Sequence, residues 1–140
     1  MEKTTRWLAN IPAVIKRILS GCYLTLVALV SLLPSDSLKK VPTFFENEDT
    51  IAHFLMYGGM SAILCWTIPR QNKKKFLYYS GIVLFCVGFG MLMEILQRIF
   101  TQLDRSFSWS DAISNLAGIC FFIPIKEKLL PGKLDSLEQS

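Results

Sequence analysis

The distribution of charge constrains this chain more than any other feature, because it leaves four long stretches almost free of charged residues. Of the 140 residues, 51% are hydrophobic and 19% are charged. A soluble domain of ordinary composition has about a quarter charged residues. An α-helix needs about 17–25 apolar residues to cross a bilayer. The sequence therefore predicts an all-α polytopic membrane protein, a bundle of four transmembrane helices at residues 18–33, 51–68, 76–100 and 111–125.

The length of the chain suits one domain. We therefore expect a single membrane domain over residues 1–140, ending in a polar tail at 129–140. Lys16 and Arg17 precede the first apolar stretch, as basic residues do in a signal peptide. No cleavage site of small residues follows the stretch, so we interpret it as a retained helix.

Two of the predicted helices carry small residues four positions apart. Gly58 and Ala62 form one such pair, and Ser114 and Gly118 form the other. In membrane helices this spacing allows two backbones to approach closely. We therefore expect both helices to pack tightly against a neighbour.

Basic residues lie mainly on one side of the predicted membrane. Of the 15 Lys and Arg residues, eleven fall in the N-terminal segment, the turn at 70–75 and the C-terminal segment. The remaining four fall at 34–50 and 98–110. Because the cytoplasmic loops of membrane proteins carry the excess of Lys and Arg, we expect a multi-pass inner-membrane protein with both termini in the cytoplasm.

The net charge of +4 comes from basic residues at the ends of the apolar stretches. Anionic lipid head groups suit that arrangement better than nucleic acid, since no basic helix with interleaved aromatic residues is present. The four cysteines fall in four different stretches without a C-x-x-C motif, which favours packing over metal binding. We expect membrane lipids as partners, no nucleic acid, no metal and no cofactor, and the oligomeric state stays open.

Polar residues recur at the outer ends of three predicted helices, spaced three or four apart and therefore on one face of each helix. Burying such groups in hydrocarbon is costly unless they are paired or hydrated. We therefore expect them to face one another in a polar pocket open to the exterior, beneath the loop at 101–110. The residues predicted to bind a ligand there are Asp49, His53, Tyr57, Glu94, Gln97, Arg98, Arg105, Asp111 and Asn115.

The same residues form three blocks in order along the chain. They are Asp-x-x-x-His-Phe-x-x-Tyr at 49–57, Glu-x-x-Gln at 94–97, and Arg-Ser-x-Ser-x-x-Asp-x-x-x-Asn-x-x-Gly at 105–118. Together they resemble the VanZ-like family over about residues 49–125, with Thr50 where many relatives have Lys. The resemblance implies a VanZ-like membrane domain in the bacterial cell envelope. It also implies a link to sensitivity to the glycopeptide teicoplanin, and it supplies no reaction.

Three functional hypotheses remain open on the sequence. In the first, Arg98 or Arg105 binds an anionic, lipid-linked or cell-wall ligand through paired hydrogen bonds. In the second, the chain is a small membrane hydrolase or transferase acting on an envelope lipid. His53, Glu94 and Asp111 are then the candidates for acid–base catalysis. In the third, the chain is a structural subunit of a membrane complex. The polar residues then serve only helix packing, as an ion pair between Glu94 and Arg98 would.

Overall fold

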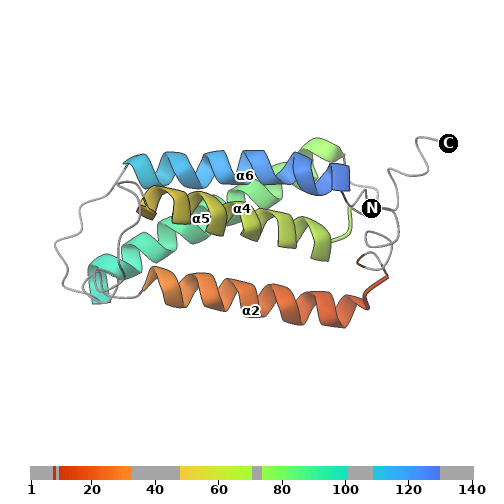
Figure 1. Cartoon of the computed structure of the whole chain (residues 1–140), viewed down its shortest axis with the longest axis horizontal. Helices are drawn as coiled ribbons and strands as arrows, with labels where there is room; N and C mark the ends of the chain where they lie inside the picture. The colour runs from red at the N-terminus through yellow and green to blue at the C-terminus, as the bar shows by residue number, and fades with distance from the viewer. Residues whose placement is uncertain (1–7, 9, 33–47, 71–73, 101–108, 130–140) are drawn as a thin grey trace.

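The structure is a computed structural model that describes residues 8, 10–32, 48–70, 74–100 and 109–129, with the side chains of 48, 49 and 100 left aside. Within these residues the chain is all-helical and has no strand, which confirms the predicted all-α class (Figure 1). The helices are α2 (Ala13–Ser31), α4 (Glu48–Thr67), α5 (Lys75–Phe100) and α6 (Trp109–Leu129).

Two helix boundaries differ from the prediction by four residues or more, and the others agree within three residues. α2 begins at Ala13 instead of residue 18, directly after Pro12, so Lys16 lies inside the helix. Proline suits this position because its fixed φ and missing N–H are tolerated where a helix starts. α6 continues through Pro124 to Leu129 instead of ending at residue 125. Residue 129 therefore belongs to the helix, and the rest of the predicted tail lies outside the described residues.

Lysine residues help to explain the longer α6. Lys126 and Lys128 occupy its last turn, where positive charge interacts favourably with the helix dipole. The apolar stretch stops before Lys126, and the predicted helix was therefore given the same end. A helix that leaves an apolar environment can continue into water as long as its last turn is compatible with solvent.

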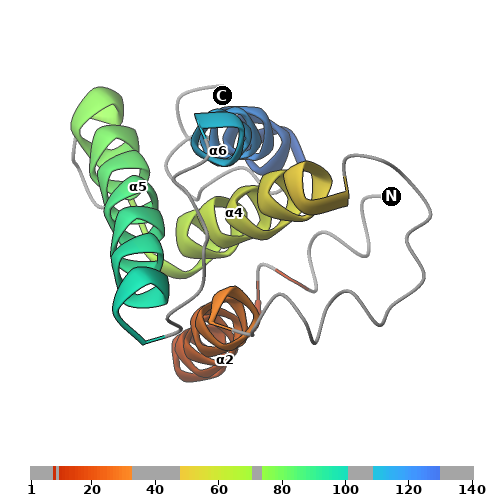
Figure 2. The same cartoon turned by 90° about the vertical axis from the view of Figure 1, so that its left-hand side faces the viewer.

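α4 lies at the centre of the bundle and contacts each of the other three helices (Figure 2). Its closest partner is α6. A side chain at Gly58 would overlap the ring of Phe122, and one at Gly118 would overlap the backbone of Phe54. The two glycines therefore permit the close approach of α4 and α6, which confirms the prediction made from the small residues of these helices.

The core is small and the outer surface is apolar. Tyr57, Met60, Cys86 and Ile119 are almost completely buried. Large hydrophobic side chains are exposed on all four helices. Two helices, Ala13–Ser31 and Lys75–Ile99, are long and apolar enough to cross a membrane, and few of their residues are buried.

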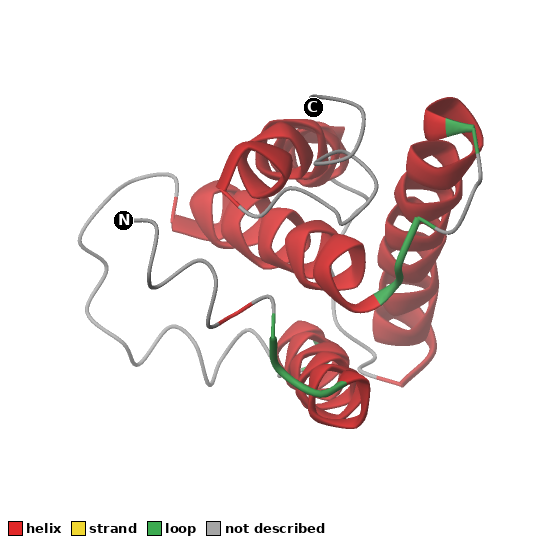
Figure 3. Ribbon diagram, turned by 90° about the vertical axis from the view of Figure 1, so that its right-hand side faces the viewer, coloured by secondary structure: helices red, strands yellow, loops and turns green. Residues whose placement is uncertain are grey.

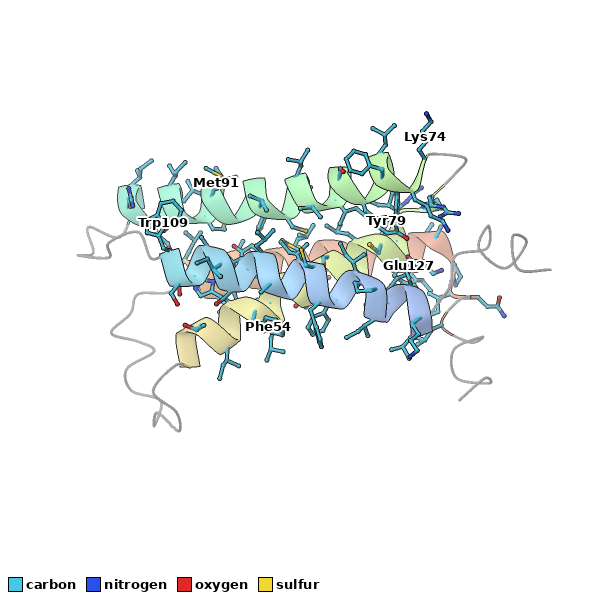
Figure 4. All side chains as sticks on the ribbon, turned by 90° about the horizontal axis from the view of Figure 1, so that it is seen from above. Phe54, Lys74, Tyr79, Met91, Trp109 and Glu127 are labelled. Carbon is cyan, nitrogen blue, oxygen red and sulfur yellow. The ribbon has the colours of Figure 1, made fainter. Side chains whose placement is uncertain are left out.

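The bundle has two ends of different construction (Figure 4). We call the end that holds the start of α2 and the end of α4 the basal end, which faces the viewer in Figure 3. The opposite end, at the start of α6, is called the pocket end. Lys74 and Glu127 lie at the basal end in Figure 4, and Trp109 lies at the pocket end.

Candidate functional site

A cavity of about 300 Å³ occupies the pocket end and is lined by all four helices. α2 contributes one residue, α4 two, α5 the largest share, and α6 its first two turns. The lining residues are Ser31, His53, Tyr57, Cys86, Val87, Gly90, Met91, Met93, Glu94, Gln97, Arg98, Trp109, Asp111, Ala112 and Asn115.

His53 and Asp111 meet across the boundary between α4 and α6. The distance from His53 Nε2 to Asp111 Oδ2 is 3.9 Å, within ion-pair range but too long for a hydrogen bond. The exposed fractions of the two side chains are 20% and 27%. The close contact of Gly118 with Phe54 lies further along both helices, and Thr50 Oγ1 lies 3.4 Å from Ser110 Oγ in their first turns. The pairing therefore follows from the packing of α4 on α6.

Tyr57 forms one wall of the cavity. Its ring stacks on that of His53, with centroids 6.1 Å apart and planes 19° apart. On its other side the ring lies against Gly90 of α5, where an added Cβ would stand 3.1 Å from a ring carbon. The absence of a side chain at Gly90 therefore makes room for the ring. The buried ring of Tyr57 therefore contacts both His53 and α5.

Gln97 joins α5 to the end of α2. Its side-chain N–H donates a hydrogen bond to the backbone carbonyl oxygen of Ser31. A carbonyl in the last turn of a helix has no intrahelical partner, so it is a natural acceptor for a neighbouring side chain. The sequence predicted Gln97 as a pocket residue but did not predict Ser31. Ser31 is one of several small polar residues of α2, as Ser20 and Thr25 are, and nothing in the sequence distinguished it as a pocket residue.

Three buried side-chain atoms that line the cavity make no hydrogen bond within the described part of the chain. They are Ser31 Oγ, His53 Nδ1 and Asn115 Oδ1, which come from three different helices. A buried polar atom without a hydrogen bond costs about 1–3 kcal/mol. The three atoms can offer hydrogen bonds to a polar group placed between the helices.

Charged side chains of both signs line the cavity. Glu94 and Arg98 come from α5, and Asp111 comes from α6. Glu94 is partly buried, whereas Arg98 is exposed at the rim. Among the described residues, no three His, Cys, Asp or Glu side chains lie close enough together to hold a metal ion. The arrangement is suited to binding a polar group or to exchanging a proton with one.

The structure brings together most of the residues that the sequence singled out. Seven of them line the cavity, whereas the side chain of Asp49 and the whole of Arg105 lie outside the described residues. Their roles in binding or catalysis stay predictions. The apolar part of the lining was not predicted, because Cys86, Val87 and Met91 look like ordinary residues of an apolar helix in the sequence.

Comparison with known proteins leaves the site to be interpreted on its geometry. No protein-family model, no curated protein and no solved structure matches this chain.

Proposed function

We propose that the chain is a multi-pass protein of the bacterial inner membrane, with four spanning helices, both termini in the cytoplasm and the pocket end facing the exterior. The exposed hydrophobic side chains on every helix support a lipid environment, since large apolar patches are rare on soluble monomers. The basal end carries Lys16, Lys75 and Lys126, which suits the cytoplasmic side.

Contacts of α2 with α4 support the retention of α2 as a spanning helix. The hydroxyl group of Tyr23 donates a hydrogen bond to the carbonyl oxygen of Met56 at 3.1 Å, and Ser20 Oγ lies 2.5 Å from Thr67 Oγ1. The ring of Tyr23 also occupies the space over Gly59. A cleaved leader would take these contacts away and leave one side of α4 uncovered.

The function that the cavity supports best is the binding of a phosphate-bearing ligand of the cell envelope, either a lipid head group or a soluble wall component. The observation that carries this proposal is the set of unbonded buried atoms on Ser31, His53 and Asn115, placed in a cavity with Arg98 at its rim. A guanidinium group binds phosphate through two parallel hydrogen bonds. The unbonded atoms would then hold hydroxyl groups of the same ligand.

The three sequence blocks that resemble the VanZ-like family support a role in the envelope and an influence on teicoplanin sensitivity. Each of the three blocks contributes residues that line the cavity: His53 and Tyr57 on α4, Glu94 and Gln97 on α5, and Asp111 and Asn115 on α6. If the proposal is right, His53→Ala lowers teicoplanin resistance in cells that depend on this protein, while its abundance in the membrane fraction stays unchanged.

Acid–base catalysis on the same ligand is a second candidate, favoured by the pairing of His53 with Asp111. A carboxylate near one ring nitrogen orients an imidazole, so that the other nitrogen can exchange a proton. His53 Nδ1, which makes no hydrogen bond within the described chain, is the atom placed for that exchange. Turnover of an added phospholipid by the purified protein, lost in His53→Ala, would favour catalysis over binding alone.

The proposed function is tested by binding of two matched probe pairs to the purified protein in neutral detergent. One pair is phosphatidylglycerol and diacylglycerol, and the other is glycerol 3-phosphate and glycerol. In at least one pair the phosphate-bearing probe should bind at least about tenfold more tightly, and Arg98→Gln should remove the difference, because one charge-assisted contact is worth about 1.5–3 kcal/mol.

Arg17→Gln is the matched control, since Arg17 is exposed on α2 near the basal end. It should leave the binding of both pairs unchanged, and a melting curve of each variant establishes that the fold is intact. Equal binding of the phosphate-bearing and phosphate-free probes, or equal loss in the Arg17 and Arg98 variants, would contradict the proposal.

A further inference from the structure

The lining of the cavity changes from polar to apolar along the axis of α5. Arg98, Gln97 and Glu94 line the part nearest the end of the helix, and Met91 and Val87 line the part deeper in the bundle. At 1.5 Å per residue, the axial distance from Arg98 to Val87 is about 16 Å. The lining is therefore polar at one end and apolar at the other, along a length much greater than a phosphate group.

The rim of the cavity is apolar between α5 and α6. Met91 and Trp109 both line the cavity, yet their exposed fractions are 59% and 74%. Figure 4 shows Met91 on α5 and Trp109 on α6, both toward the pocket end. Ala112, one turn further along α6, also lines the cavity and presents only a methyl group. The cavity therefore reaches the outer surface of the bundle on this side.

Side-chain contacts close the other helix boundaries around the cavity. Tyr57 fills the space over Gly90 between α4 and α5, and Gln97 bonds to α2. The Gly118 contact, together with the pairing of His53 and Asp111, closes the boundary between α4 and α6. Among α4, α5 and α6, which line most of the cavity, the pair α5 and α6 makes the fewest contacts. The boundary between α2 and α5 has fewer contacts still, and Gln97 bridges it at the cavity.

We infer that the ligand of this cavity is a membrane phospholipid that enters sideways between α5 and α6, placing its phosphate near Arg98 and part of an acyl chain along Met91 and Val87. The inference rests on the proposed function and narrows it from phosphate-bearing ligands to lipids. A soluble ligand would leave the apolar half of the cavity in contact with water. An acyl chain buries that half, and each buried methylene strengthens binding about fourfold.

Substitutions in the cavity wall, each with a matched control, test this inference. Ala112→Phe places a ring in the cavity, whereas Ala117→Phe adds the same ring to an exposed position of α6 that does not line it. Met91→Trp and Leu92→Trp form a second pair on α5, where both residues are exposed but only Met91 lines the cavity. The second pair keeps the test valid if the ring at residue 112 impairs folding.

The measurement is binding of phosphatidylglycerol and of glycerol 3-phosphate to each variant in neutral detergent. The wild-type protein should bind phosphatidylglycerol at least about a hundredfold more tightly, because several methylenes are buried. Ala112→Phe and Met91→Trp should each weaken lipid binding about tenfold or more, and Ala117→Phe and Leu92→Trp should leave it within about twofold, as surface changes usually do. A lipid with a diazirine in its acyl chain should label peptides that contain Met91 and Trp109.

Different failures have different meanings. If glycerol 3-phosphate binds as tightly as the lipid and Arg98→Gln weakens both, the proposed function stands and the lipid inference is wrong. If the lipid binds but each pair of wall variants behaves alike, the lipid lies elsewhere and the inference is again wrong. If neither phosphate-bearing probe binds better than its phosphate-free partner, the proposed function fails, and the inference fails with it.

Discussion

The two ends of the bundle use similar polar residues for opposite purposes. At the basal end, polar side chains form hydrogen bonds to the backbone of neighbouring segments. The Tyr78 hydroxyl lies 2.6 Å from the carbonyl oxygen of Ile68 and 3.1 Å from that of Cys65. Thr67 Oγ1 donates to the carbonyl oxygen of Lys16 at 3.3 Å. The indole N–H of Trp66 donates to the carbonyl oxygen of Leu8 at 3.2 Å.

At the pocket end, buried polar atoms of Ser31, His53 and Asn115 line a cavity and make no hydrogen bond to any other described residue. Hydrogen bonds between segments stabilise the basal end, whereas three of the four buried side-chain atoms that lack a hydrogen bond within the described residues line the cavity at the pocket end. Such atoms destabilise the folded state unless a ligand binds them. The difference teaches that the contacts of the basal end stabilise the fold, and that the pocket end gives up some stability for binding if it holds the ligand that we propose.

The largest effect is expected where α4 and α6 cross, because this contact supports both ends. Gly118→Leu places a side chain against the backbone of Phe54 and should lower the free energy of unfolding by about 3 kcal/mol or more, the upper range for overpacking. The melting temperature in detergent should fall, or the protein should fail to accumulate. Gly81→Leu is the control, since no atom of the described residues lies within 4 Å of a Cβ added there, and a comparable loss would invalidate the comparison.

The next largest effect is expected at the basal end. Tyr78→Phe removes the hydroxyl that bonds to the carbonyl of Ile68 and should destabilise the protein by about 1–2 kcal/mol. A thermal melt measures the loss, and phosphatidylglycerol binding should not change. If binding falls as much as stability does, the two ends are not separable in function.

At the pocket end, a substitution of Asn115 should remove ligand binding without lowering stability, the reverse of what is expected for Tyr78→Phe. Asn115→Leu introduces an apolar side chain of similar size in place of an amide whose buried oxygen makes no hydrogen bond within the described residues. The free energy of unfolding should stay within about 1 kcal/mol of the wild type or rise, because such replacements are close to neutral. Binding of the phosphate-bearing probe should be lost. A destabilisation as large as that of Tyr78→Phe would assign Asn115 to helix packing instead.

The smallest effects on stability are expected at two ion pairs, one at each end. Asp111→Asn removes the carboxylate near His53, and Glu127→Gln removes the one that lies 2.9 Å from Lys126 Nζ. Each should change the free energy of unfolding by less than about 1 kcal/mol, as is usual for partly exposed pairs. Only Asp111→Asn should weaken ligand binding or turnover. If Asp111→Asn and Glu127→Gln have the same effect on stability and on ligand binding, Asp111 has no role in binding the ligand.

Parts of the site could be predicted from the sequence, because the periodicity of a helix depends only on neighbouring residues. The spacing from His53 to Tyr57 places both on one face of α4 in any fold that keeps the helix. Hydropathy likewise located the four helices, although it misplaced the start of α2 and the end of α6. It missed the contribution of Ser31, because nothing in the apolar stretch indicates which neighbour its last turn meets.

The sequence by itself determined the all-α class, the positions of the helices and the small residues at which two of them pack. Only the tertiary structure decided that α4 is central, that His53 pairs with Asp111, and that α2, α4, α5 and α6 line one cavity. The physical reason is that hydropathy and spacing act along one chain segment at a time. Which side chains meet depends on how closely and at what angle the helices cross, and that is fixed by contacts between distant segments, such as Gly118 on Phe54.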